Sequence, residues 1–490
     1  MAKSHVAAPS VAIIGAGFGG LCMAIQLVRA GVASFLIFER ASDVGGTWLE
    51  NTYPGAACDI PSHLYAFSFE PKHDWSRAYA EQPEILSYLQ HCARKYGLLE
   101  HIRFDTEVRG ASFDERRNLW SLELGDGSTC EATVLISAVG QLNRPALPSV
   151  PGRETFAGPA FHSAQWRHDV AFTGKRVAVV GTGASAVQIV PELAKQAASL
   201  VLFQRSAPYV IPKGDRPYRR FEKALFCALP FVQKVSRALK YAMHESRVIA
   251  FAYAKGAMAL PRAAFQKHLE SQVADPELRR KLTPDYQMGC KRIMISNDYY
   301  AALARPNVEV VTDAIGRITE TGIVTADGAE RAFDAIVYAT GFASTGFLMP
   351  MRITGRDGID LHTAWRGGAE AYLGITVTGF PNLFLLYGPN TNLGHNSIVY
   401  MLESQVTYVM DCIRALGSGK VARLDVRPSV QKRYNERLQR RIAGTVWAAG
   451  CTSWYLDPSG KNVNNWPAFT FAYKRQTKKL KLRDYIPAPA

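Results

Sequence analysis

The sequence predicts an α/β protein with at least two domains, because one strand–loop–helix–strand pattern occurs twice. The pattern spans residues 11–39 and again residues 177–206. In each copy a short apolar run, typical of a buried parallel strand, leads into a glycine-rich loop, a helix and a second strand. This order is that of Rossmann-like dinucleotide-binding domains, and 490 residues exceed what one hydrophobic core usually organises.

The first glycine-rich loop has the spacing that a dinucleotide pyrophosphate requires. It places glycines at Gly15, Gly17 and Gly20. Glycines at these positions let backbone N–H groups approach the pyrophosphate at the N-terminus of the following helix. Glu39 ends the second strand about 20 residues further on, where a carboxylate accepts hydrogen bonds from ribose hydroxyls. We therefore expect this unit to bind the ADP half of FAD.

The second loop predicts a site for NADPH. Its three small positions are filled by Gly181, Gly183 and Ala186. At the end of its second strand, neutral Gln204 stands where the first unit has Glu39, and Arg205 and Ser206 follow. A carboxylate would repel a 2′-phosphate, whereas a guanidinium binds it through two hydrogen bonds. The pattern therefore favours NADPH over NADH.

A stretch between the two loops carries a more specific pattern. The spacing F-x-G-x-x-x-H-x-x-x-W is matched by Phe156, Gly158, His162 and Trp166. It resembles the signature of the flavin-dependent Baeyer–Villiger monooxygenases (class B flavoprotein monooxygenases), where it links the FAD and NADPH modules. Family members usually have Pro or Asp after the Trp, where this chain has Arg167. The related enzymes that oxidise nitrogen and sulfur usually have Tyr in place of Trp166, so the resemblance favours carbonyl oxygenation.

The roles of two residues of this motif need to be weighed separately. No acid–base step is evident for His162, so we assign it to communication between domain motion and NADPH binding and not to general-base catalysis. Trp166 either packs at the domain junction or fills the core.

The resemblance also covers segments that approach the flavin and NADPH. The loop G-G-T-W over 45–48, the stretch Y-P-G-A-A-C-D over 53–59, the A-T-G turn over 339–341 and the segment T-S-W-Y over 452–455 all match. The resemblance implies cofactor contacts from Gly46, Thr47, Trp48, Asp59, Tyr65, Thr340, Gly341, Asn390 and Trp466.

One further matching segment contains a candidate catalytic arginine. G-C-K-R over 289–292 is similar to a family motif, and it implies that Arg292 is the active-site arginine, that Asp59 contacts and positions it, and that Lys291 helps hold the NADPH 2′-phosphate. A guanidinium does not deprotonate in proteins, so it stabilises an anionic flavin C4a-peroxide without protonating it. It also stabilises the charge that develops on the Criegee intermediate, as oxyanion donors do elsewhere.

The linkers predict a discontinuous first domain. Pro- and Gly-bounded linkers near residue 150 and just past the A-T-G turn suggest an FAD-binding domain in two parts, 1–148 and 343–490. The NADPH-binding domain, 149–342, lies between them. Residues 217–282 have no strand-like run, so we expect a helical insertion that helps form a substrate tunnel or a lid. Its apolar segments could alternatively touch a membrane or a partner.

Composition narrows the partners and the compartment. The formal charge of +15 favours anionic partners such as dinucleotide phosphates, and no nucleic-acid-binding module is recognisable. The eight cysteines are scattered without C-x-x-C or metal-ligand spacing, which fits reduced thiols better than disulfides and predicts no metal site. Neither a signal-peptide core nor an uncharged apolar run of roughly 18 residues occurs. We expect a cytoplasmic protein without a transmembrane segment and with at most weak membrane contact.

Together these features predict an FAD-containing, NADPH-dependent Baeyer–Villiger monooxygenase. It would use O2 to convert a small-molecule ketone into an ester or lactone through a C4a-peroxyflavin and a Criegee intermediate. One alternative is a heteroatom monooxygenase that makes sulfoxides or N-oxides. A second is a flavin disulfide reductase, which Cys58 disfavours because no second cysteine lies close to it in sequence. A third is a non-catalytic FAD-binding protein, which Arg205 and Arg292 argue against.

Overall fold

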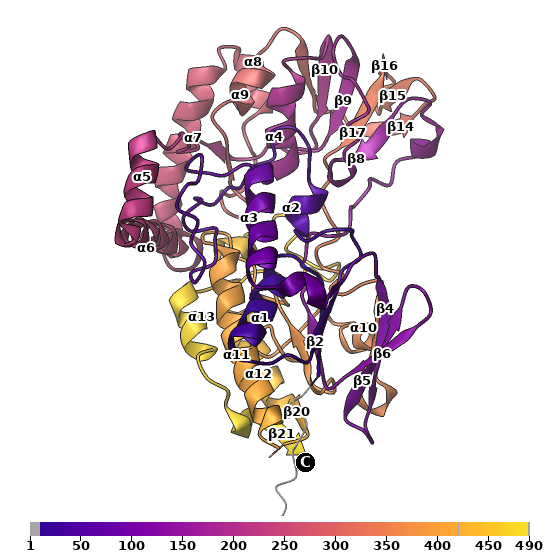
Figure 1. Cartoon of the computed structure of the whole chain (residues 1–490). Helices are drawn as coiled ribbons and strands as arrows, with labels where there is room; N and C mark the ends of the chain where they lie inside the picture. Colours follow the sequence, from indigo (N-terminus) through magenta and orange to yellow (C-terminus); the bar gives the residue numbers. More distant parts are fainter. Residues whose placement is uncertain (1–9, 420, 489–490) are drawn as a thin grey trace, which may run out of the picture.

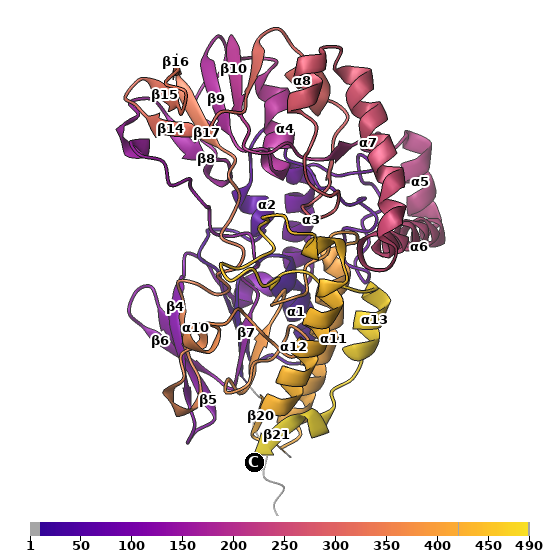
Figure 2. The same ribbon diagram turned by 180° about the vertical axis from the view of Figure 1, so that it is seen from behind.

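The chain folds into two lobes, each built around a parallel sheet (Figure 1). The structure is a computed structural model that describes residues 10–419 and 421–488. In the lower lobe, N-terminal segments (indigo) lie among C-terminal segments (orange and yellow), whereas the middle of the chain forms the upper lobe. The view from behind shows the same division (Figure 2). The α/β class with Rossmann-like sheets, predicted from the two glycine-rich units, is confirmed.

The first sheet lies in the lower lobe and carries the loop 15–20. Its strands are all parallel, in the order β19–β7–β1–β2–β3. They are β1 (Val11–Ile14), β2 (Phe35–Phe38), β3 (Ile102–Arg103), β7 (Val134–Ser137) and β19 (Leu383–Leu385). Helices α3 (Gln82–Lys95) and α11 (Ile398–Gly417) pack against α1 (Phe18–Arg29), and the three helices share one hydrophobic core with this sheet. Because β19 comes from the C-terminal part of the chain, that part completes the first sheet.

The second sheet lies in the upper lobe and carries the loop 181–186. It is also fully parallel, in the order β13–β10–β9–β17–β8. Its strands are β8 (Ala160–His162), β9 (Arg176–Val180), β10 (Ser199–Phe203), β13 (Val308–Val311) and β17 (Ala335–Tyr338). Helices α4 (Ala184–Leu193) and α9 (Tyr299–Leu303) contact each other in the core of this lobe. The strand β8 belongs to the F-x-G-x-x-x-H-x-x-x-W segment, which therefore forms one edge of the sheet.

The remaining strands form smaller sheets. They are β4 (Val108–Asp114), β5 (Leu119–Leu124), β6 (Thr129–Ala132) and β18 (Arg352–Thr354) in one sheet, β14 (Ile315–Ile318), β15 (Gly322–Thr325) and β16 (Glu330–Ala332) in another, and the pairs β11 (Val210–Ile211) with β12 (Met294–Ile295) and β20 (Arg423–Val426) with β21 (Tyr485–Ala488). The stretch predicted to be helical holds α5 (Arg220–Ala228), α6 (Pro230–Ser246), α7 (Ala259–Gln272) and α8 (Pro276–Lys281). The other helices are α2 (Thr47–Glu50), α10 (Leu361–Ala364), α12 (Pro428–Ala443) and α13 (Thr470–Gln476).

Two segments that connect the sheets run side by side. Pro145 and Phe342 form an antiparallel bridge. The N–H of Ala146 donates to the carbonyl of Gly341 at 2.9 Å, and the N–H of Ala343 donates to the carbonyl of Arg144 at 2.9 Å. The outgoing and returning connections are thus hydrogen-bonded to each other.

The third glycine of the first loop allows α1 to pack closely on β1. A Cβ atom added to Gly20 would lie 1.9 Å from the carbonyl oxygen of Gly15. We expect Gly20→Ala to lower the free energy of unfolding by about 1–3 kcal/mol, as overpacking does. Thermal unfolding followed by circular dichroism measures the effect. The matched control is Gly256→Ala, where an added Cβ meets no atom within 4 Å; equal melting temperatures for the two variants would contradict the packing argument.

Candidate active site

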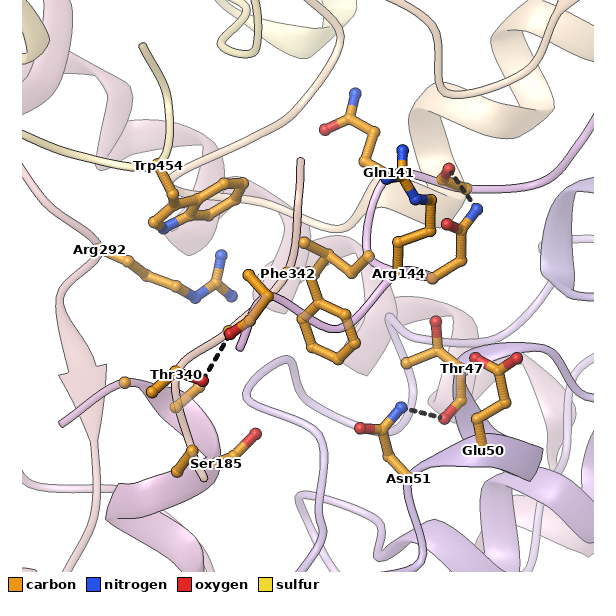
Figure 3. Close-up of a pocket in the computed structure, with 18 of the residues that line it drawn as sticks. Thr47, Glu50, Asn51, Gln141, Arg144, Ser185, Arg292, Thr340, Phe342 and Trp454 are labelled. Carbon is orange, nitrogen blue, oxygen red and sulfur yellow. Dashed lines mark hydrogen bonds between the residues drawn. The ribbon is translucent and has the colours of Figure 1, made fainter. Parts of the chain in front are cut away.

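One large cavity lies where the two lobes meet. Its volume is about 1280 Å³, and both glycine-rich loops line it. Most of the predicted site residues contribute to its wall: Gly15, Gly17, Glu39, Gly46, Thr47, Trp48, Asp59, Tyr65, Gly181, Gly183, Arg205, Ser206, Lys291, Arg292, Thr340 and Gly341. In Figure 3, Arg292 and Trp454 lie at one side of the cavity and Thr47, Glu50 and Asn51 at the other. The fold therefore gathers residues that are far apart in sequence into one site.

The carboxylate of Glu39 is fixed at the edge of the first loop. Its Oε2 accepts a hydrogen bond from the N–H of Ala16 at 2.7 Å, and its Oε1 accepts one from the N–H of Ala41 at 2.9 Å. The side chain is buried but lines the cavity. A carboxylate oxygen can accept more than one hydrogen bond, so Glu39 retains acceptor capacity toward a ribose.

The loop 45–48 and Tyr65 form a rigid wall beside the first glycine-rich loop. A Cβ added to Gly46 would lie 3.1 Å from the Cα of Gly17, so the two loops approach closely at their glycines. The indole N–H of Trp48 donates to the Tyr65 hydroxyl at 3.2 Å. Thr47 begins α2, and its carbonyl accepts from the side-chain amide of Asn51 at 3.0 Å (Figure 3).

The second loop leaves open space at the N-terminus of α4. A Cβ added to Gly183 would meet no atom within 4 Å. An uncovered helix N-terminus attracts anions through its free N–H groups and its dipole. Ala186, at the third small position, is fully buried and packs in the core behind the loop. The arrangement fits a pyrophosphate at this end of the cavity.

A cluster of cations lies beside this opening. The Nζ of Lys291 donates to the Ser206 hydroxyl at 3.0 Å and lies 4.4 Å from the centre of the Tyr286 ring. Burial, and then the nearby charge of Arg205, lower the pKa of Lys291. Two cations that repel each other in this way are stabilised by a bound anion. Gln204 also lines the cavity; its side-chain N–H donates to the Lys281 carbonyl at 2.7 Å, and its Oε1 is buried without a protein partner.

Arg292 is held in the cavity wall by Asp59. The guanidinium donates to Oδ2 of Asp59 through Nε at 3.1 Å and also through Nη2. About a quarter of the Arg292 side chain and a third of the Asp59 side chain are exposed. Burial acts to raise the pKa of Asp59, but the charge and hydrogen bond of Arg292 outweigh it and the pKa is lowered. The negative charge of Asp59 raises the pKa of Arg292 despite burial, so both groups are charged.

His162 is buried with both ring nitrogens engaged. Its Nδ1 accepts from the N–H of Ala164 at 3.1 Å, which places the proton on Nε2. That nitrogen lies 2.9 Å from the Gly341 carbonyl and donates to it. Burial lowers the pKa of His162, although the Gly341 hydrogen bond acts to raise it. A neutral imidazole with no free nitrogen is a connector between β8 and the A-T-G turn, and it is poorly suited to general-base catalysis.

The other motif residues pack at the edge of the second lobe. A Cβ added to Gly158 would lie 2.7 Å from the buried ring of Phe156. Trp166 contacts the rings of Phe161 and Phe172, with ring centres 5.3 and 5.4 Å apart. Of the two roles open to Trp166, core packing fits this environment.

Arg167, the departure from the family pattern, forms an exposed ion pair with Asp169. An exposed pair of this kind contributes little to stability. Arg167 also lies outside the wall of the large cavity.

The expectation that all cysteines are unpaired is wrong. Cys290 and Cys451 form a disulfide, with their Cα atoms 6.3 Å apart. The pairing was hidden because 161 residues separate the two cysteines in sequence. It joins the loop that carries Arg292 to the loop that carries Trp454. Cys58 is free and buried, and burial raises the pKa of its thiol.

Two residues predicted to contact cofactors lie behind the cavity wall. The side-chain amide of Asn390 donates to the Asn462 carbonyl at 2.8 Å. Trp466 is buried in the core of the first lobe, where its indole N–H donates to the Phe469 carbonyl at 3.1 Å. Trp454 lines the cavity in its place, and Figure 3 shows its indole next to the Arg292 guanidinium.

Several polar residues of the cavity wall escaped the sequence analysis. They are Gln141, Arg144, Ser185, Gln188 and Asn396. The signal that could have identified the first two is their position just after β7, because ligands bind outside the carboxyl ends of parallel strands. Gln141 donates to the Tyr387 carbonyl at 3.0 Å, and its Oε1 is buried without a protein partner.

Comparisons with known proteins agree with this geometry. The profile of the flavin-binding monooxygenase-like family matches residues 8–351. A Baeyer-Villiger monooxygenase of Pseudomonas aeruginosa is 48% identical over 477 residues, which cover 97% of this chain and 90% of that protein. The closed crystal structure of cyclohexanone monooxygenase matches with a TM-score of 0.89 at 28% identity, covering 98% of this chain and 99% of that one. The crystal structure of OTEMO in complex with FAD and NADP matches with a TM-score of 0.88 at 29% identity, covering 99% of this chain and all of that one.

The ion pair between Arg292 and Asp59 predicts a pH-dependent loss of stability. Asp59→Asn leaves the guanidinium without its counterion, and we expect it to lower the free energy of unfolding by about 1–3 kcal/mol near pH 7, less than for a fully buried pair. Because the folded state lowers the pKa of Asp59, this contribution is present above the ordinary value of 3.8 and is lost as the pH falls through the lower folded value.

Urea unfolding at a series of pH values, from neutral to acidic, tests this expectation. The difference between wild type and Asp59→Asn should stay constant down to about pH 5 and narrow below it. The matched control is Asp169→Asn, which breaks the exposed pair with Arg167 and should change stability little. A difference for Asp59→Asn that does not vary with pH would contradict the assigned charge state.

Proposed function

The chain belongs to the flavin-binding monooxygenase-like family, and we propose that it is an FAD- and NADPH-dependent Baeyer–Villiger monooxygenase that converts a small-molecule ketone into an ester or lactone with O2. The observation that carries the proposal is the Arg292 guanidinium, held by Asp59 in a cavity that both glycine-rich loops line. The names of the similar proteins favour carbonyl oxidation over oxidation of sulfur or nitrogen.

The residues of the cavity fit both cofactors. FAD would be held at the first loop, with Glu39 to accept from the ribose hydroxyls and Gly46, Thr47, Trp48 and Tyr65 to line the flavin end of the cavity. NADPH would be held at the second loop, with Arg205, Ser206 and Lys291 as the residues for the 2′-phosphate. We assign the FAD-binding domain to 1–148 and 343–490 and the NADPH-binding domain to 149–342, with 217–282 as its insertion. When bound and reduced, the flavin supplies the electrons that activate O2.

Arg292 supplies a positive charge that does not give up its proton. It therefore stabilises an anionic oxygen in the cavity without protonating it, and it stabilises the negative charge that develops on the ketone oxygen. Asp59 acts as the positioning residue, because it orients the guanidinium and balances its charge. His162 ties the edge strand β8 to Gly341, in the turn where the chain leaves the second sheet, and we assign it to communication between lobe movement and NADPH binding.

The competing functions fit the site less well. A flavin disulfide reductase needs a cysteine pair beside the flavin, but Cys58 is buried without a cysteine partner and the disulfide joins Cys290 to Cys451. A protein that only stores FAD would not need charged Arg205 and Arg292 in the cavity wall. We further propose that the enzyme acts in the cytoplasm.

The role assigned to Arg292 predicts a split between two measurable activities. Arg292→Ala should retain flavin reduction by NADPH, because the 2′-phosphate contacts remain, and it should lower ester formation by at least about a hundredfold, as the loss of an oxyanion donor does. Anaerobic stopped-flow reduction measures the first activity. Gas chromatography of the product from cyclohexanone and a panel of linear ketones measures the second.

Arg292→Lys tests whether charge alone is sufficient. It keeps a cation but replaces the non-titrating fork with a proton donor, so ester formation should stay low. Ester formation by Arg292→Ala at the wild-type rate would show that Arg292 is not needed for the reaction. Activity of the wild type toward thioethers alone would favour the heteroatom class.

The cation cluster predicts the coenzyme preference. Arg205→Gln should raise the KM for NADPH by about tenfold or more, the loss expected for one hydrogen bond to a charged group, while kcat and the KM for NADH stay near wild type. Steady-state oxidation of both coenzymes measures this. Lys175→Gln, an exposed cation of the same lobe outside the large cavity, is the control. An equal rise in the KM for NADPH and the KM for NADH would show that Arg205 does not contact the 2′-phosphate.

A further inference from the structure

Helix α6 presents its polar side to the protein. Gln233, Arg237, Tyr241 and Glu245 recur every four residues and face inward. Gln233 donates to the Lys72 carbonyl at 2.6 Å, and Arg237 donates to the carbonyls of His63 and Ala66 at 2.8 and 2.9 Å. The Tyr241 hydroxyl lies 3.0 Å from that of Thr470, and Glu245 accepts from the Asn396 amide at 2.6 Å. Hydrogen bonds therefore tie this side of α6 to the rest of the protein along the length of the helix.

The opposite side of α6 is apolar and exposed. Four apolar side chains also recur every four residues, each two positions before one of the polar residues, and they are 51–67% exposed: Phe231, Val235, Leu239 and Met243. Three more continue the surface through α5 and the turn before α6: Phe221, Leu225 and Leu229. We call these seven residues the apolar face. In Figures 1 and 2, α5 and α6 lie at the outer edge of the molecule. An inverted helix of this kind leaves a contiguous apolar surface for an external partner.

Positive charge surrounds the apolar face. Residues 216–267 contain eleven Lys or Arg residues and only two acidic residues. Both acidic side chains are already engaged, because Glu222 pairs with Arg216 at 2.6 Å and Glu245 is buried. Three of the basic side chains are exposed: Arg219 just before α5, Arg220 on α5 and Lys234 on α6. A second copy of the chain would bring like charges together, whereas an anionic surface would neutralise them.

We propose that the apolar face is a peripheral membrane-binding surface that takes a bilayer containing anionic lipids. Apolar side chains of α5 and α6 enter the acyl boundary, and the flanking Lys and Arg residues bind the lipid headgroups. The contact is peripheral, since no helix in residues 10–419 and 421–488 combines the length and the hydropathy needed to cross a bilayer.

Vesicle flotation of the FAD-loaded enzyme tests the proposal. The probes are vesicles of phosphatidylcholine alone and of equimolar phosphatidylcholine and phosphatidylglycerol. We expect binding to the anionic vesicles that weakens in about 1 M NaCl, where the Debye length is about 3 Å. The double variant Phe231→Ser/Leu239→Ser should lower the partition coefficient by at least about tenfold, because each substitution removes several buried carbon atoms.

The control variant removes two exposed apolar side chains elsewhere on the molecule. Ile359→Ser/Leu482→Ser changes residues that are 41% and 47% exposed, outside the apolar face, and should bind like wild type. NADPH oxidation in solution checks that each variant folds.

Three outcomes would overturn the proposal: wild type that floats with neither vesicle, equal binding by both double variants, or equal binding to neutral and anionic vesicles. Sedimentation velocity tests whether a second copy of the chain, and not a membrane, covers the apolar face. A wild-type dimer that Phe231→Ser/Leu239→Ser converts to a monomer would make the apolar face an interface between copies of the chain.

Discussion

The ion pair between Arg292 and Asp59 is the contact on which the site depends, because it joins the two lobes inside their shared cavity. Asp59 lies in an irregular segment between α2 and α3 of the first lobe, and Arg292 lies just before β12 in the second. Neither charge would be favourable in the cavity wall without the other. The pair therefore couples the position of the guanidinium to the placement of the lobes, and a relative movement of the lobes would move this charge within the cavity.

The loop that carries Arg292 is fixed by three consecutive residues that contact three different parts of the molecule. Cys290 is bonded to Cys451, near Trp454 in the C-terminal loop. Lys291 donates to Ser206, in the loop that follows β10. The third residue, Arg292, pairs with Asp59. A short irregular segment has few hydrogen bonds of its own, so contacts of this kind determine its conformation. The three contacts connect the loop to the second glycine-rich unit, to the segment of Asp59 and to the C-terminal loop, so they fix the position of the G-C-K-R motif.

Local patterns in the sequence were sufficient for the fold class, and they failed where a contact depends on how the lobes dock. The glycine spacing at 15–20 and 181–186 follows from backbone geometry within one strand–loop–helix unit, and the parallel sheets and the similar structures confirm it. Glu39 and Lys291 could be placed because each sits next to a recognisable motif. The Cys290–Cys451 bond joins loops that are adjacent only in the folded chain. Trp454 and Trp466 stand in one C-terminal segment, and only the turn between them determines that Trp454 lines the cavity while Trp466 enters the core.

The inverted polarity of α6 has a cause in the site itself. The segment that carries Asp59 and Tyr65 forms no regular secondary structure, so its backbone carbonyls need donors from neighbouring elements. Arg237 supplies donors to His63 and Ala66, and Ser236 lies 3.0 Å from the His63 ring. A helix that must offer polar groups inward along its length can place its apolar residues only on the outer side, because its period is close to four residues. Helix α6 thus supports the segment that carries Asp59 on one side and exposes the apolar face on the other. A membrane that covers that face would hold α6, and through it the Asp59 segment, in a single orientation.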